Sequence, residues 1–234
     1  MKKDKQKRIS NWVKFDILTL FPDSLDSYFN SSILKRAQVN KLIEINTHDI
    51  REQATDKRKT VDDTPYGGGP GMVIQIEPVY KTLKKIYPRQ NKSTRVILMS
   101  PQGRSLDQNE VKRLAKYKRI ILIAGHYEAI DARIDNFIDE KISLGNFVLT
   151  GGELAAACII DSVSRLVPGV VGKEESVQDE SFSEYNEKTK EFNVEFPQYT
   201  RPEVFKGLKV PEVLLSGHHG QIKEWRDEQT RYRK

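Results

Sequence analysis

The middle of the sequence alternates between apolar runs of strand length and longer segments with apolar residues at helical spacing. Residues 96–100 and 120–124 are the runs, and residues 107–117 and 153–166 are the helical segments. Strands that alternate with helices in this way predict a parallel α/β sheet. Such sheets bind ligands at the carboxyl ends of their strands, so a functional site is expected there.

Three of the predicted strand ends lead into loops that contain glycine. The loops span residues 101–103, 125–128 and 144–152, and the last one ends in Thr-Gly-Gly directly before a helical segment. Adjacent glycines allow backbone conformations closed to other residues and leave no side chain in the way. The free N–H groups at the start of the following helix would face whatever lies there, so loop 144–152 is a candidate ligand loop.

The composition narrows the class of protein. A chain of 234 residues fits one large domain, or one domain plus a small one. No apolar run approaches the ~20 residues that span a membrane, and the lysine-rich start lacks the apolar stretch of a secretory signal. The single cysteine, Cys158, excludes an intramolecular disulfide and a cysteine-cluster metal site. We expect it to be a buried small side chain in a cytoplasmic protein.

The net charge of +6 gathers at the two ends of the chain. Residues 1–8 contribute +4 and residues 226–234 contribute +2, so the body between them is neutral overall. Basic tails can follow the phosphates of a nucleic acid. Residues 173–195 hold eight acidic and three basic side chains and few aliphatic ones, which is typical of a mobile linker.

Several common sites are missing from the sequence. It lacks G-x-G-x-x-G, G-x-x-x-x-G-K-[ST], H-E-x-x-H, C-x-x-C and G-x-S-x-G. Their absence weighs against a Rossmann dinucleotide site, a P-loop, common zinc sites and a hydrolase nucleophile. The histidines lack metal-ligand spacing, apart from the adjacent pair His218 and His219, which we interpret as a surface turn.

Six segments follow one another in the order of a known set of motifs. They are residues 60–72 (TVDDTPYGGGPGM), 100–104 (SPQGR), 125–131 (GHYEAID), 144–154 (LGNFVLTGGEL), 197–202 (PQYTRP) and 215–219 (LSGHH). Together they resemble the bacterial tRNA (guanine-N1)-methyltransferases, members of the SPOUT superfamily, over nearly the whole chain. A single glycine cluster would be a weak signal, whereas six segments in register are specific.

The resemblance implies a fold and a domain organisation. The fold is α/β, with a SPOUT-type parallel sheet and a deep trefoil knot, followed by a small, mainly helical C-terminal domain. The implied domains are a catalytic, S-adenosylmethionine-binding domain at residues 11–171, an acidic mobile linker at 172–195 and a tRNA-binding domain at 196–234. A homodimer with shared active sites is also implied, with the tRNA anticodon stem-loop as partner and no membrane.

The implied reaction moves a methyl group from S-adenosylmethionine to N1 of the guanosine just 3′ of the anticodon. The resemblance assigns to the cofactor Leu98, Pro101, Gly103, Gly125, Tyr127, Glu128, Leu144, Gly145, Asn146, Phe147, Val148, Leu149, Gly151 and Gly152. Glu128 is expected to hold ribose hydroxyls or to face the cationic end of the cofactor. Two positions depart from the family pattern, because Ala129 replaces the usual glycine and Asn146 the usual aspartate.

The implied chemistry needs a base and a cation. Neutral guanine carries a proton on N1, which a carboxylate could remove as general base. Arg165 matches the family's catalytic arginine, which would stabilise charge that develops on O6. The family's aspartate base aligns with Glu180, because residues 178–182 read QDESF here. Asp179, just before it, is the alternative base.

Candidate tRNA contacts are basic or aromatic residues on predicted loops, namely Arg51, Lys57, Arg58, Lys59, Tyr199 and Arg201. We assign no metal ligand, and the sequence leaves open whether Mg²⁺ is a further cofactor and which tRNAs are preferred. Two other functions stay open at this point. One is methylation of a ribose or of ribosomal RNA, and the other is RNA binding without catalysis.

Overall fold

The computed structural model describes residues 12–172, 181–183, 185, 186, 189 and 191–233. The chain divides into two compact units, with the boundary between residues 172 and 173. Across these described ranges, no helix is both long enough and apolar enough to cross a membrane.

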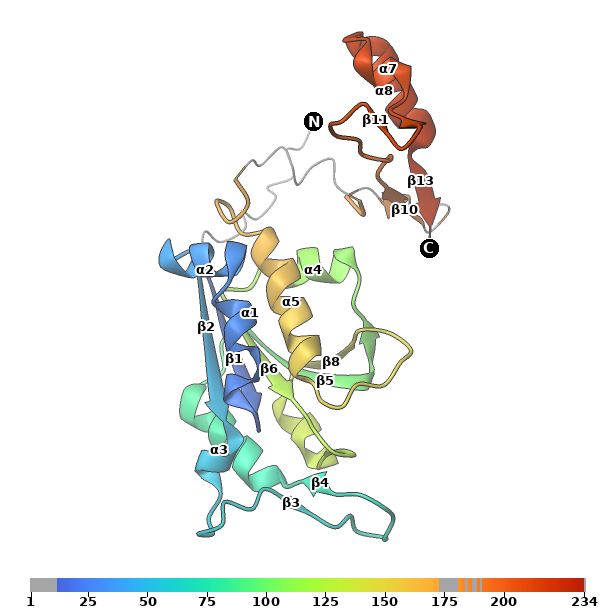
Figure 1. Cartoon of the computed structure of the whole chain (residues 1–234). Helices are drawn as coiled ribbons and strands as arrows, with labels where there is room; N and C mark the ends of the chain where they lie inside the picture. The colour runs from blue at the N-terminus through green and yellow to red at the C-terminus, as the bar shows by residue number, and fades with distance from the viewer. Residues whose placement is uncertain (1–11, 173–180, 184, 187–188, 190, 234) are drawn as a thin grey trace, which may run out of the picture. The chain divides into compact units, whose positions relative to one another are not determined.

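Five parallel strands form the central sheet of the first unit. In chain order they are β1 (Val13–Thr19), β2 (Ile43–Asp49), β5 (Thr94–Ser105), β6 (Arg119–Ala124) and β8 (Glu140–Ser143). Their order across the sheet is β2-β1-β6-β5-β8, and each neighbouring pair is parallel. The parallel α/β sheet expected from the sequence is therefore confirmed (Figure 1).

Apolar side chains cover both faces of this sheet. In β6, Ile120 and Leu122 belong to one buried cluster, whereas Ile121 and Ile123 belong to the other. Successive strand residues point to opposite faces, so the uninterrupted apolar run of this strand reflects burial on both sides.

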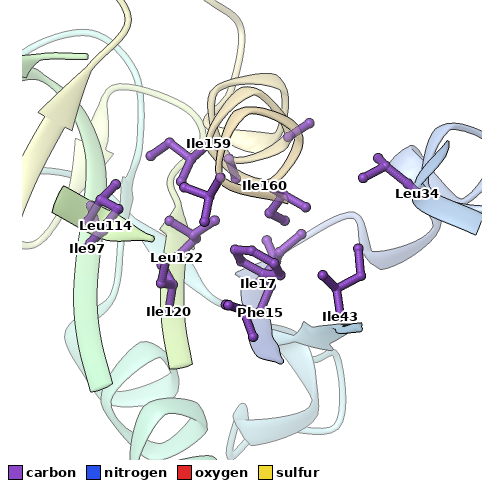
Figure 2. Close-up of a cluster of buried hydrophobic side chains, with 14 of the residues drawn as sticks. Phe15, Ile17, Leu34, Ile43, Ile97, Leu114, Ile120, Leu122, Ile159 and Ile160 are labelled. Atoms are coloured by element: carbon purple, nitrogen blue, oxygen red, sulfur yellow. The ribbon is translucent and has the colours of Figure 1, made fainter. Parts of the chain in front are cut away.

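Helices pack against both clusters. The first cluster includes residues of α1 (Asp26–Phe29), α2 (Ser32–Val39), α4 (Gln108–Leu114) and α5 (Glu153–Arg165), and the 3-10 helix η1 (Pro22–Leu25) adds Leu25. Figure 2 shows Ile159 and Ile160 of α5 beside Leu122 and Phe15 of the sheet. The second cluster includes residues of α3 (Ile76–Ile86) and of the 3-10 helices η2 (Ile50–Gln53) and η3 (Ala132–Phe137).

A small second sheet ties the glycine-rich motif at residues 60–72 to the loop that follows β6. Its strands are β3 (Asp62–Asp63), β4 (Val73–Ile74) and β7 (Ala129–Ile130), in the order β3-β4-β7. β4 pairs antiparallel with β3 and parallel with β7. Two motifs that lie far apart in sequence are thereby brought side by side.

Two details of the first unit differ from the sequence-based expectations. β5 does not end at residue 100 but continues to Ser105, after a register shift against β8 between Met99 and Arg104. Cys158, expected to be buried, is exposed. Its neighbours Ala157 and Ile159 are buried, but successive residues of a helix point to different sides, so a buried neighbour does not imply a buried cysteine.

The second unit combines short strands and helices. β10 (Glu191–Val194) pairs antiparallel with β9 (Tyr185–Asn186) and with β13 (Arg231–Arg233), and a hairpin of β11 (Val204–Phe205) and β12 (Leu208–Lys209) precedes α7 (Glu212–Leu215) and α8 (His219–Gln229). Part of the interval 172–195, expected to be a linker, therefore contributes strands to this unit. The ring centroids of Tyr185 and Phe192 lie 4.7 Å apart. The acidic composition of this interval gave no indication of this packing contact.

The buried cluster between α4 and the sheet should be sensitive to small losses of volume. Val111→Ala is expected to lower the free energy of unfolding by about 1–3 kcal/mol, because it removes apolar volume from the core. Val111 is helical and 3% exposed, whereas Val39, also helical, is 71% exposed. Val39→Ala is the matched control and should stay within about 0.5 kcal/mol of the wild type. Urea unfolding measures both, and equal losses would contradict this account of the core.

Candidate active site

The middle of β5 and the carboxyl ends of β6 and β8 border a cavity of about 430 Å³. Twelve of the residues assigned to the cofactor line it, namely Leu98, Pro101, Gly125, Tyr127, Glu128, Leu144, Gly145, Phe147, Val148, Leu149, Gly151 and Gly152. Residues 98–102 of β5 and the two glycine-containing loops after β6 and β8 therefore meet at one site. This is the sheet edge at which parallel α/β folds bind ligands.

The loop after β8 returns to the end of β6 through a very close backbone contact. The N–H of Gly152 donates to the carbonyl oxygen of Gly125 at 2.8 Å, and Gly151 forms an antiparallel bridge with His126. A Cβ on Gly152 would lie 2.8 Å from Cα of Ala124. The φ angle of Gly152 is −82°, which other residues adopt, so space rather than conformation requires glycine here.

Glu128 sits beside the glycine-rich motif. Its N–H donates to the carbonyl oxygen of Met72 at 3.2 Å, and a Cβ on Gly71 would collide with the Glu128 side chain. Gly71 also has a φ of +81°, a conformation that favours glycine. The motif at residues 60–72 therefore supports one wall of the cavity although it does not line it.

Two residues assigned to the cofactor do not line the cavity. Gly103 lies within β5, and an added Cβ there would collide with the backbone of Lys141 and Ile142 in β8. The close approach of two strands thus accounts for this glycine. Asn146 is exposed and lies outside the lining, although both of its neighbours belong to it.

The sequence reasoning missed several lining residues. Lys141 is one of them, and its Nζ donates to Asp135 Oδ2 at 2.8 Å and to Gln102 Oε1 at 3.1 Å. The ion pair links β8 to η3, and the bond to Gln102 links β8 to β5, beside the cavity. No motif marks Lys141 or Asp135, so only the placement of their elements at the same sheet edge could have identified them. His126, a member of the third motif, also lines the cavity.

Arg165 lies at the opposite end of α5 from the cavity. The helix begins at Glu153, directly after the lining residue Gly152, and ends at Arg165. A rise of 1.5 Å per residue separates these ends by roughly 18 Å. Arg165 instead borders a second cavity of about 230 Å³. The structure therefore does not bring the predicted catalytic arginine to the predicted cofactor residues of the same chain.

The second cavity is lined by polar groups. Tyr28 Oη donates to Asp161 Oδ2 at 2.5 Å, and this hydrogen bond, with burial and the nearby carboxylate charge, raises the pKa of Tyr28 to about 12. Asp161 lies one helical turn before Arg165. The Ser164 hydroxyl is buried and has no hydrogen-bond partner within the described part of the chain. The lining of this cavity thus includes a cation, an anion and hydroxyl groups beside apolar side chains.

The candidate tRNA contacts fall into two groups. Arg51 is half-buried in η2, and Lys57, Arg58 and Lys59 are exposed on the loop that follows it. Asp56 shapes this loop, since its carboxylate accepts from the Thr60 hydroxyl and amide and from the Arg58 amide, and these bonds lower its pKa.

The second group lies in the C-terminal unit. Tyr199 and Arg201 line a cavity of about 340 Å³ there. In the same cavity the Arg226 guanidinium lies 4.9 Å from the ring centroid of Phe196. The predicted bases Asp179 and Glu180 lie outside the described residues. Among the residues that are described, no group of three or more His, Cys, Asp or Glu side chains could hold a metal ion.

The chain is similar to known proteins over nearly its whole length. A family model described as tRNA (Guanine-1)-methyltransferase TrmD matches residues 13–234. A tRNA (guanine-N(1)-)-methyltransferase of Ruminiclostridium cellulolyticum is 50% identical over 221 residues, which cover 93% of this chain and 91% of the relative. A protein of the same name from Clostridium acetobutylicum is 48% identical over 218 residues, covering 93% and 86%.

A solved structure is also similar. The crystal structure of tRNA (m1G37) methyltransferase from Aquifex aeolicus aligns with a TM-score of 0.73 at 38% sequence identity, covering 92% of this chain and 88% of that one. Because the family model and the relatives all span nine-tenths of the chain, the chain belongs to the tRNA (guanine-1)-methyltransferase family.

Proposed function

We propose that the protein transfers a methyl group from S-adenosylmethionine to N1 of the guanosine just 3′ of a tRNA anticodon. As a member of its family the chain is a tRNA (guanine-N1)-methyltransferase. The observation that carries the proposal is the meeting of three motif segments on one cavity of the sheet. These segments are the ones that the family resemblance assigns to the cofactor.

The residues of the cavity fit S-adenosylmethionine by their chemistry. Its volume of about 430 Å³ lies within the range of ~300–1,000 Å³ that is common for small-molecule sites. Leu98, Phe147 and Leu149 offer apolar surface to the faces of an adenine, and backbone groups of Leu144 offer hydrogen bonds to its edge. Glu128 suits the ribose hydroxyls or the cationic end of the cofactor.

The remaining chemistry concerns the guanine. When bound, the cofactor supplies an electrophilic methyl group. The chain must take the proton from guanine N1, and Glu180 is the carboxylate that we assign as general base, with Asp179 as the alternative. Arg165 would stabilise the negative charge that develops on O6, because its guanidinium is a permanently charged donor.

The length of α5 supports a homodimer with shared active sites, which is part of the proposal. One protomer holds the cavity at the start of this helix and Arg165 at its end, roughly 18 Å apart, so a single protomer cannot apply both to one guanine. A symmetric partner would bring its own Arg165 to the cavity. Exposed Leu154, Cys158 and Tyr28 give the surface around α5 an apolar character that suits such an interface.

A trefoil knot of the SPOUT type is part of the proposal. The path of the chain after β8 supports this proposal. The chain leaves β8 at one edge of the sheet and returns to β6, which lies between β1 and β5. Gly152 contacts the end of β6 there, before α5 packs on the sheet.

For tRNA we propose phosphate contacts from Arg51, Lys57, Arg58 and Lys59 and further contacts from Tyr199 and Arg201.

The substrate itself implies a cytoplasmic enzyme. A requirement for Mg²⁺ is open to direct assay by chelation.

Arg165→Ala should lower methylation by at least about 10²-fold, because the charge on O6 loses its partner. The dissociation constant of S-adenosylmethionine should not change, since the role assigned to Arg165 is a contact with guanine O6 and not with the cofactor. Methyl-transfer assays would use tRNA transcripts with G or A just after the anticodon, and only the G transcript should react. Full activity of this variant would remove Arg165 from the mechanism.

Shared active sites can be tested by mixing two inactive variants. Leu149→Arg fills the cofactor cavity, and Arg165→Ala removes the catalytic cation. Randomly exchanged dimers should regain about a quarter of wild-type activity, because half of them are mixed and each of those has one intact site. Sites that lie within single protomers would give a mixture without activity.

The general base can be identified by single-turnover methylation rates. Glu180→Gln should lower the rate by roughly 10²–10⁴-fold, because an amide cannot accept the N1 proton. Asp179→Asn is the matched control, and we expect it to retain most of the rate. If Asp179→Asn alone is slow, the assignment passes to Asp179, and if neither is slow, proton removal occurs elsewhere or by solvent.

A further inference from the structure

A buried carboxylate lies next to the glycines of the cofactor loop. Glu153, the first residue of α5, is 8% exposed, and its Oε1 accepts a hydrogen bond from the Thr19 hydroxyl at 2.7 Å. Thr19 ends β1 and is 1% exposed. Its hydroxyl oxygen also accepts the N–H of Phe21 at 2.9 Å, which fixes the direction in which the hydroxyl proton points.

The second oxygen of Glu153 faces a histidine. His126 Nδ1 lies 4.0 Å from Glu153 Oε2, too far for a hydrogen bond, and this nitrogen is buried without a hydrogen-bond partner among the described residues. The ring of His126 is held edge-on against Phe21, with centroids 4.9 Å apart. A Cβ on Gly151 would collide with both Glu153 and His126, so Gly151 lies between the two side chains.

These contacts join three parts of the chain that are distant in sequence. Thr19 comes from the end of β1, His126 from the end of β6, and Glu153 from the start of α5. A carboxylate withdrawn from water is costly unless its oxygens are satisfied. Its place in the first turn of a helix, where the backbone N–H groups are free, reduces that cost. Because Thr19 supplies the side-chain hydrogen bond, loss of this hydroxyl should release the turn that Glu153 holds.

We propose that Thr19 and Glu153, with the His126 ring beside them, form a buried clamp that keeps the loop at residues 144–152 in its cofactor-binding conformation. Glu153 fixes the turn at Gly151 and Gly152 against the end of β6. Thr19 and Glu153 do not line the cavity, so they are positioning residues that act through the glycines. The inference rests on the proposed function only in naming S-adenosylmethionine as the ligand of the loop.

Thr19→Val tests the clamp, because it removes the hydroxyl at nearly constant shape. By calorimetry the dissociation constant of S-adenosylmethionine should rise about tenfold, as expected for loss of a hydrogen bond to a charged group. The constant for S-adenosylhomocysteine should rise by the same factor, and kcat at saturating cofactor should stay within about twofold. Thr19→Ser should restore wild-type binding. Thr19→Ala, which adds no atoms, should give the same shift if the valine variant does not fold.

A matched control comes from the other face of the sheet. Thr82 is 2% exposed and donates its hydroxyl to the carbonyl oxygen of Pro78 within α3. Thr82→Val therefore makes an equally buried change away from the cavity, and cofactor binding should not change. Hydrogen exchange of the ligand-free protein gives a second measurement. The amides of residues 144–152 should exchange faster in Thr19→Val than in Thr82→Val.

The possible results distinguish a failure of the clamp proposal from a failure of the proposed function. Unchanged cofactor binding and unchanged exchange in Thr19→Val would overturn the clamp while leaving methyltransfer intact. A loss confined to S-adenosylmethionine would also overturn it, because the carboxylate would then act on the sulfonium charge directly. A wild-type protein that binds no S-adenosylmethionine would instead contradict the proposed function, and the exchange measurement would still test the clamp.

Discussion

The backbone contact between Gly152 and the end of β6 is the constraint on which the rest of the first unit depends. The chain passes so close to Ala124 and Gly125 that no side chain fits at Gly152. This contact sets where α5 starts. From that point the apolar residues of the helix, Ile159 and Ile160 among them, pack on the sheet (Figure 2). One close approach therefore positions both a wall of the cavity and a large part of the core.

Much of this arrangement could be predicted from the sequence because it is encoded locally. Continuous apolar runs such as residues 120–124 mark strands that are buried on both sides. Glycines at strand ends, combined with the family motifs, indicated twelve of the residues that line the cavity, about half of the lining. Gly103 shows the limit of this reasoning. Glycine permits the close approach of a ligand and of a neighbouring strand equally, and only the position of β8 decides between them.

The features that the sequence did not predict depend on contacts between distant segments. β10 lies in an acidic stretch, and the sequence did not predict it as a strand. It pairs with β13 at residues 231–233, a partner that is distant in sequence. Cys158 belongs to an apolar stretch of α5, yet it is exposed. Helical periodicity predicts which residues share one face of a helix, but it does not predict whether another part of the chain covers that face. Lys141 and Asp135 meet in the cavity lining only because the fold brings β8 and η3 to one edge. Such pairings are long-range properties with no local signature.

The separation along α5 has a consequence for how the proposed reaction is controlled. A rigid helix cannot bend its arginine back to the cavity at its other end, so the donor site and the guanine site would meet only when two protomers pair. The methyl group would then face its acceptor only in the assembled enzyme. Under that arrangement the clamp at Thr19 and Glu153 would govern affinity for the cofactor, whereas Arg165 would govern the reaction rate. Substitutions at the two ends of one helix should therefore affect different kinetic constants, although a continuous run of backbone hydrogen bonds joins them.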